Sequence, residues 1–107
     1  MQGYQVTFFT QQDRRHGGKP LGEWILQEAR ALGIGGGTLI AAAEGFGHNG
    51  KFHSAHFFEL ADQPVEVVLA VSEAEAERLF ARLREANVKV FYVKTPVEFG
   101  VLGDEPG

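Results

Sequence analysis

One stretch near the middle of the chain constrains the fold most, because a strand pattern runs directly into a helix start. Apolar residues occupy alternate positions there, as in a strand with one buried face: Val65, Val67, Leu69 and Val71. Ser72 follows at once and Glu75 stands three residues later, which is the spacing of a capping box. Apolar residues then recur at helical spacing: Ala76, Leu79, Phe80, Leu83 and Ala86. The stretch predicts a half-buried strand followed by an amphipathic helix, with Asn87 as a left-handed stop.

The N-terminal part of the chain repeats this strand–helix order. Aromatic and β-branched residues alternate with polar ones in 4–10, which predicts a strand, and the polar stretch 11–19 is expected to be a loop. Pro20 then opens a helix, where its missing N–H costs little. Gly33 and the glycine run 35–37 end it. The apolar face of this helix holds Leu21, Trp24, Ile25, Ala29 and Leu32.

The remaining extended stretches complete a βαββαβ order. Three further stretches have strand character: 38–43, 56–60 and 88–93. A turn or strand break is expected at 62–64. This order is that of the ferredoxin-like α+β sandwich, in which two helices cover one face of a four-stranded antiparallel sheet. We expect one domain over 1–94 and a partly irregular tail over 95–107.

The second face of the predicted sheet is apolar as well. By alternation it carries Phe9, Ile40, Ala42, Val68, Ala70, Phe91 and Val93. A monomer would present polar side chains on such a face, so the pattern predicts self-association. The alternative is that the tail folds back over this face, but the tail is short and rich in glycine, which favours the oligomer.

Charge and cysteine content exclude several classes of function. The net charge of -4 argues against general nucleic-acid binding, which needs a basic excess. The chain has no cysteine, so it has no disulfide, thiol nucleophile or cysteine metal site. Neither a signal peptide nor an apolar run of the ~20 residues that span a membrane is recognisable. We therefore expect a cytoplasmic protein.

A basic segment before the first predicted helix is the first candidate binding site. It combines fixed cations with a histidine and two glycines: Arg14, Arg15, His16, Gly17, Gly18 and Lys19. Free N–H groups and the positive dipole end at a helix N-terminus suit a phosphate. The segment is not a Walker A loop, because no Ser or Thr follows Lys19. A solvated basic turn explains the segment equally well.

A glycine-rich stretch after the second predicted strand is the second candidate. Three glycines within six residues let the backbone approach a ligand closely: Gly45, Gly47 and Gly50. Lys51 is placed to reach a phosphate. The alternative is a flexible hairpin connection.

The histidines in and beside this stretch are a weaker candidate, for a metal: His48, His53 and His56. In a strand, His53 and His56 would point to opposite faces, so ordinary loop histidines are the favoured interpretation. The sequence contains no nucleophile elbow, no paired carboxylates at readable spacing and no evident Ser-His-acid set. We therefore do not expect an enzyme.

The two candidate stretches together resemble the PII signalling superfamily. Glu44-Gly45-Phe46-Gly47 is similar to the Gly-Phe-Gly motif that closes the second strand of PII proteins and opens their long T-loop. Asp13-Arg14-Arg15-His16-Gly17-Gly18-Lys19-Pro20-Leu21 is similar to a pattern of one branch, the PII-like proteins long classed as a domain of unknown function. The resemblance covers roughly residues 3–94.

This resemblance implies a homotrimer whose sheets face inward and whose subunits bind an adenine nucleotide between them. The effector would be ATP, ADP, AMP or a cyclic nucleotide, with or without Mg. A T-loop-like segment, 45–56, would then dock on a transporter, a channel or an enzyme. With the basic segment included, the expected binding residues are Arg14, His16, Gly17, Gly18, Lys19, Glu44, Gly45, Phe46, Gly47, Asn49 and Lys51.

The chain also departs from PII proteins. Asn49 falls where they have a glutamine that meets Mg-ATP and 2-oxoglutarate. Phenylalanines occupy the neighbourhood of their modified T-loop tyrosine, so uridylylation is not expected. Their lysine-bearing phosphate loop is missing at 85–88. We expect either that the basic loop 14–19 replaces those phosphate contacts or that the ligand is smaller. Two alternative functions remain, a trimeric metal-binding protein that uses the loop histidines and an interaction module without a ligand.

Overall fold

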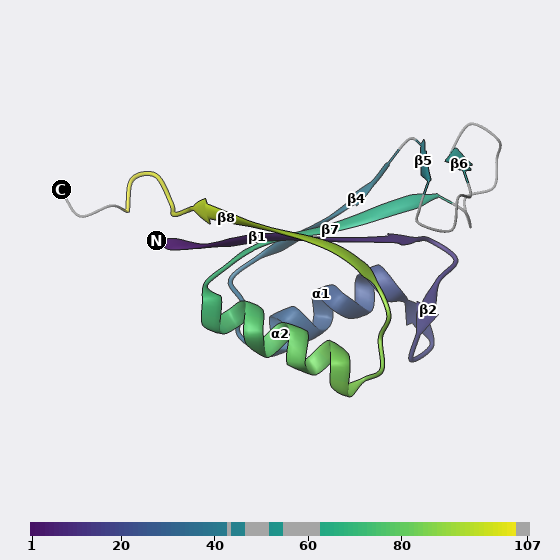
Figure 1. Ribbon diagram of the computed structural model, residues 1–107, viewed down its shortest axis with the longest axis horizontal. Coiled ribbons are helices and arrows are strands. Elements are labelled where there is room, and N and C mark those ends of the chain that lie inside the picture. Colours follow the sequence, from purple (N-terminus) through teal and green to yellow (C-terminus); the bar gives the residue numbers. More distant parts are fainter. Residues whose placement is uncertain (43, 47–51, 55–62, 105–107) are drawn as a thin grey trace.

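The computed structural model describes residues 1–42, 44–46, 52–54 and 63–104. At its centre is a four-stranded antiparallel sheet in the order β4-β7-β1-β8. Two helices, α1 (Leu21–Ala31) and α2 (Glu73–Glu85), cover one face of this sheet (Figure 1). Its strands are β1 (Gln2–Gln11), β4 (Gly37–Ala41), β7 (Pro64–Val71) and β8 (Phe91–Glu98). The predicted α+β class and ferredoxin-like order are confirmed.

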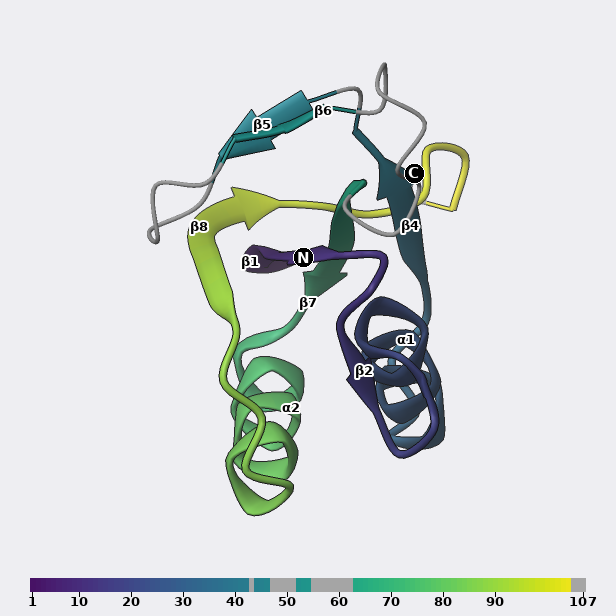
Figure 2. The same ribbon diagram turned by 90° about the vertical axis from the view of Figure 1, so that its right-hand side faces the viewer.

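Two short antiparallel ladders lie at one end of the sheet (Figure 1). One pairs β2 (Arg15–His16) with β3 (Lys19–Pro20) and lies beside α1. The other pairs β5 (Glu44–Phe46) with β6 (Phe52–Ser54) on the side of the sheet away from the helices (Figure 2). The predicted extended stretch 56–60 lies outside the described residues.

The core lies between the sheet and the helices, where the alternation predicts it. Every second residue of β7 is buried: Val65, Val67, Leu69 and Val71. β1 contributes Val6 and Phe8, neither of which has exposed surface. The helices add residues at helical spacing: Leu21, Trp24, Ile25, Ala29, Ala76, Leu79 and Leu83. Burial of these apolar side chains is the main favourable term in the folding of such a layer pair.

Helix α2 begins and ends as its sequence predicts. The Ser72 hydroxyl accepts a hydrogen bond from the Glu75 N–H at 3.1 Å, and the Glu75 carboxylate accepts one from the Ser72 N–H at 2.8 Å. Both donors would otherwise lack a partner in the helix. Asn87 follows the helix with a φ of 58°, so the predicted left-handed stop is confirmed.

The prediction of a single loop over 11–19 is wrong. β1 continues to Gln11, and residues 15–20 form the β2–β3 hairpin. The hairpin was not predicted because each of its strands is only two residues long, which is too short to show a strand pattern in a polar stretch. Pro64 is the first residue of β7 rather than a strand break, which is a position where proline is tolerated.

The last strand is longer and later than predicted. It starts at Phe91 instead of residue 88 and continues to Glu98, into the stretch expected to be tail. Pro96 lies within it, opposite Tyr4 of β1. In the described sheet β8 is an edge strand that pairs only with β1. Proline is tolerated there, because the N–H that it lacks would point away from the sheet and would have no strand to pair with.

The β1–β8 pair extends to the start of the chain. The ammonium group of Met1 donates a hydrogen bond to the Phe99 carbonyl at 2.9 Å, and the Phe99 N–H donates one to the Met1 carbonyl at 2.9 Å. Met1 and the last residues of β8 therefore lie at the end of the sheet opposite the hairpin (Figure 1).

The face of the sheet away from the helices is open in the single chain and carries exposed apolar side chains, as predicted, although Glu66 of β7 also lies on it, opposite Phe9. Phe9, Ile40, Phe91 and Val93 expose between 38% and 55% of their surface. The rings of Phe9 and Phe91 pack against each other with centroids 5.8 Å apart. Within the described part of the chain, no helix combines the length and the apolar character needed to cross a membrane.

Candidate functional site

The basic segment forms a tight hairpin, and this accounts for its two glycines. Gly17 and Gly18 occupy the turn with φ of 61° and 82°. Two successive positive φ values define a type I′ turn, whose twist matches that of the flanking strands. The Arg15 guanidinium closes the turn by donating a hydrogen bond to the Gly18 carbonyl at 2.8 Å. The turn geometry therefore explains the two glycines, and the cationic residues lie on either side of the turn.

The hairpin is attached to both helical segments of the molecule. The Leu21 N–H at the start of α1 donates to the Arg14 carbonyl at 2.8 Å. The Arg14 guanidinium donates to the carbonyl of Lys89, in the loop between α2 and β8. The Lys19 ammonium donates to Oε1 of Gln27 on α1 at 2.5 Å. Arg14 and Lys19 are thus both bonded to neutral acceptors, which an anion can replace.

Trp24 joins the hairpin to the two helices. The His16 ring lies against the indole with ring centroids 4.2 Å apart. The Arg82 guanidinium of α2 lies 5.5 Å from the centroid of the Trp24 ring and forms an ion pair with Glu28 of α1 at 2.7 Å. His16 therefore has a packing role that its sequence context did not reveal.

The glycine-rich stretch is described only at its two flanks. Glu44, Gly45 and Phe46 pair with Ser54, His53 and Phe52, so an antiparallel ladder brackets the stretch. Gly47, Asn49 and Lys51, which were predicted to bind the ligand, lie outside the described residues, as do His48 and His56. No group of three potential metal ligands is found among the residues that are described.

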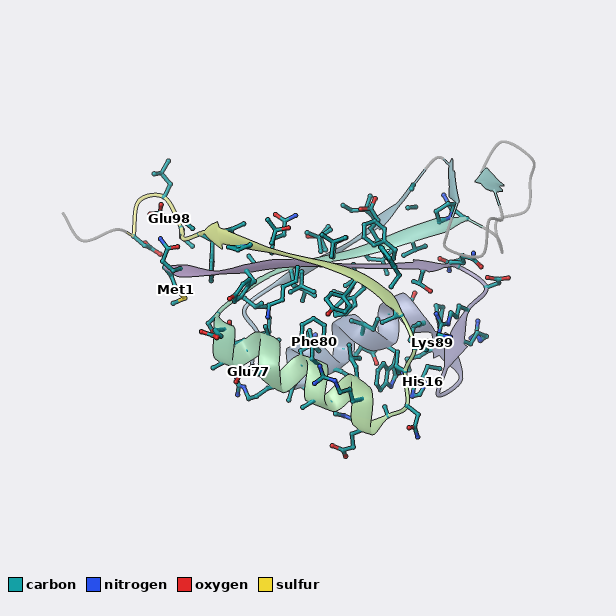
Figure 3. All side chains as sticks on the ribbon, in the orientation of Figure 1. Met1, His16, Glu77, Phe80, Lys89 and Glu98 are labelled. Atoms are coloured by element: carbon teal, nitrogen blue, oxygen red, sulfur yellow. The ribbon has the colours of Figure 1, made fainter. Side chains whose placement is uncertain are left out.

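The hairpin and the glycine-rich stretch leave the sheet at the same end. β1 runs into the hairpin, and the Gln12 N–H donates to the Gln63 carbonyl at 2.9 Å. The Ala42 N–H, just after β4, donates to the Pro64 carbonyl at 2.8 Å. Figure 3 shows His16 and Lys89 near this end, with Met1 and Glu98 at the other. Two stretches that are distant in sequence thus share one end of the molecule.

Sequence reasoning missed two residues of this arrangement, Lys89 and Gln27. Lys89 contributes its backbone carbonyl, 75 residues from Arg14 along the chain, so no local pattern could reveal the contact. Gln27 lies on the first helix at a polar position, and nothing in the sequence indicates that Lys19 bonds to it.

The chain has the α+β class and the element order of the ferredoxin-like sandwich, and one family model matches most of its length. The model of the DUF190 family, described as "Uncharacterized ACR, COG1993", matches residues 3–99. The chain belongs to the DUF190 family, so the resemblance to the PII-like branch of unknown function is confirmed.

Individual relatives agree with this assignment. The chain is 29% identical over 75 residues to a UPF0166 protein of Aquifex aeolicus (strain VF5), a match that covers 70% of this chain and 71% of the relative. A candidate PII-like signaling protein of Thermus thermophilus has a similar structure, with a TM-score of 0.65 and 22% identity over 90% of this chain and 87% of that one. CPII of Thiomonas intermedia K12, a nitrogen regulatory PII-like protein bound to ADP, AMP and bicarbonate, has a TM-score of 0.62 and 13% identity over 94% and 97% of the two chains. The likeness to the two structures shows the PII-like fold.

Proposed function

We propose that this chain is a cytoplasmic regulatory protein that binds an adenine nucleotide and controls a partner protein, without a catalytic role. In this proposal three copies assemble through their open sheet faces. The nucleotide lies between subunits, and the segment 45–56 contacts a membrane transporter, a channel or an enzyme. A nucleotide that binds two states of this segment with different affinity shifts the balance between them.

One observation carries the proposal: the Arg14 side chain joins the basic hairpin to the loop between α2 and β8. PII proteins have their phosphate loop after the second helix, and here that loop receives an arginine from the hairpin. Arg14, Arg15 and Lys19 of the hairpin add to the one cation of this loop, Lys89. In this proposal the hairpin provides the phosphate contacts, and Gly45, Phe46 and Gly47 also bind the nucleotide.

The test is calorimetric titration of the purified protein with ADP, AMP and ATP, each with and without magnesium and bicarbonate. The nucleotides bound by CPII are the first choice because its chain shares this fold. We expect saturable binding of at least one nucleotide, and a matching rise in the thermal midpoint because the ligand binds only the folded state.

The variants Arg14→Gln and Lys19→Gln test the role of the hairpin. Loss of one charge-assisted contact to phosphate should weaken nucleotide binding by roughly tenfold to a hundredfold. Arg78→Gln is the matched control, since it removes one exposed cation from α2 outside the hairpin. Unchanged affinity in both hairpin variants would show that the phosphates bind elsewhere, and absence of any nucleotide binding would overturn the proposed function itself.

A further inference from the structure

Aromatic rings meet along the line where α2 lies beside the edge strand β8. Figure 2 shows α2 below β8 at one edge of the sheet and α1 at the other edge. Phe80 of α2 packs against Phe8 of the core with ring centroids 5.9 Å apart, and against Tyr92 of β8 at 4.8 Å. Tyr92 keeps 49% of its surface exposed. The core therefore holds these rings in place, and Tyr92 presents a flat apolar surface to solvent.

Two exposed cations lie on the same rings. The Lys94 Nζ is 4.2 Å from the centroid of the Tyr4 ring and 5.8 Å from that of Phe80. The guanidinium carbon of Arg84 is 5.9 Å from the Phe80 centroid. Both cationic side chains belong to exposed residues. We refer to these five residues as the α2–β8 seam: Tyr4, Phe80, Arg84, Tyr92 and Lys94.

Neither cation of the seam has an acidic partner within the described part of the chain. The ion pair that is found there joins Arg82, on the same helix, to Glu28 of α1. Lys94 and Arg84 contact aromatic rings instead, and such contacts are weak at exposed sites. A carboxylate forms a stronger, charge-assisted hydrogen bond with either cation. The seam therefore lacks the anions that its two charges would bind most strongly.

The spacing of the two charges limits what can bind both of them. They lie 5.8 Å and 5.9 Å from one ring centroid, so they are no more than about 12 Å apart. An extended chain spans about 3.3–3.6 Å per residue. Two acidic residues within four positions of each other therefore reach both cations. An apolar residue midway between them on the same face would then lie over the rings.

The charge of the molecule favours a protein segment over a larger polyanion. The net charge of -4 repels nucleic acid at a distance. Nucleic-acid binding commonly engages about six to ten phosphates, and recognition of an anionic membrane surface commonly uses about four to eight basic residues. The seam offers two cations beside an apolar surface, which match a short acidic segment that also contains an aliphatic side chain.

We propose that the α2–β8 seam is a docking surface for an acidic segment of a partner protein. Two carboxylates of this segment pair with Lys94 and Arg84, and an aliphatic side chain between them lies on Tyr92. The seam is on the helix side of the sheet, so the proposed association through the open sheet face does not use it. It also shares no residue with the proposed nucleotide site.

The test is a nuclear magnetic resonance titration of the full chain with a blocked peptide of the sequence glutamate-serine-leucine-serine-glutamate. The peptide should cause saturable shifts of the Phe80, Tyr92 and Lys94 amide signals, and added sodium chloride should weaken its binding. A peptide with glutamine in place of glutamate should bind about tenfold more weakly. A peptide with serine in place of leucine should also bind about tenfold more weakly, because it loses the apolar contact with the rings.

Variants of the two cations test the seam from the protein side. Arg84→Gln and Lys94→Gln should each weaken peptide binding about threefold, and the double variant about tenfold. The thermal midpoint should stay near that of the parent, because both residues are exposed. Arg78→Gln is the matched control, since it removes an exposed cation of α2 that lies outside the seam.

Four results would overturn the inference. The first is the absence of saturable shifts at the seam, and the second is a double variant that binds the peptide like the parent. The third is loss of the peptide response in Arg14→Gln, which would move the acidic segment to the hairpin. The fourth is tighter binding of oligothymidylate or of phosphatidylglycerol vesicles at the seam, which would assign it to another class of partner. Failure of nucleotide binding alone leaves the peptide result intact, so the two proposals are tested independently.

Discussion

Gly17 and Gly18 both have positive φ, but they do not constrain the hairpin equally. The φ of Gly17, 61°, lies in the left-handed region that asparagine tolerates, whereas the 82° of Gly18 lies beyond it. Gly18→Ala should therefore destabilise the hairpin by about 1 kcal/mol, while Gly17→Asn should change its stability by less than about 0.5 kcal/mol. Trp24, the chain's one tryptophan, reports on the hairpin because His16 lies against it.

The measurement is denaturant unfolding followed by Trp24 fluorescence, with circular dichroism as the probe of the helices. We expect the Trp24 fluorescence of Gly18→Ala to change at low denaturant, before the helices unfold. Equal behaviour of the two variants would show that the turn is not of the type I′ geometry.

At the scale of elements, the capping box of α2 is the clearest case in which a local pattern determines an element boundary. Ser72→Ala removes the acceptor of the Glu75 N–H and should lower the free energy of unfolding by about 1 kcal/mol. Glu75→Gln keeps a side-chain acceptor for the Ser72 N–H and should cost less. Urea unfolding of both variants measures the difference. A larger loss in Glu75→Gln than in Ser72→Ala would contradict this account.

The elements that the sequence predicts well are those with a long periodic pattern. Alternation along β7 and the apolar stripes of α1 and α2 extend over enough residues to outweigh local exceptions. The β2–β3 hairpin was missed because its strands are too short to show alternation, although Gly17-Gly18 is a two-residue turn signal. The expected tail over 95–107 conflicts with the extent of β8 because proline is normally unfavourable in a strand, and only the position of Pro96 on an edge strand makes it compatible with one.

The candidate site could be predicted in its composition but not in its connections. Arg14 and Lys19 were identified from residue type and from their place before a helix. Their partners, Lys89 and Gln27, depend on how α1 and the loop after α2 pack together. The packing of His16 on Trp24 likewise depends on the hairpin geometry rather than on spacing along the chain.

At the scale of the whole molecule, the open sheet face predicts how copies associate. A cation at position 91 would lie beside Phe9, and burial of this face in the assembly would remove its water. Phe91→Lys should therefore convert the protein from a species of three times the 11.7 kDa chain mass to a monomer. Light scattering measures this mass. Lys94→Gln, on the same strand but with its ammonium over the Tyr4 ring on the helix side, is the control and should leave the mass unchanged. A parent protein that is already monomeric would refute the proposed assembly.

The pairing of Met1 with Phe99 has a mechanical consequence. A pull on both ends of the chain acts on β1 and β8 at the same end of an antiparallel pair, from Gln2 opposite Glu98 onward. Such a load opens the ladder one hydrogen-bonded step at a time, like a zipper, instead of shearing all of its bonds together. An unfolding machine that grips the C-terminus would likewise peel β8 away first and bare the core residues that it helps to cover. The chain would then yield to degradation at low force from that end, however well the rest of the sheet is packed.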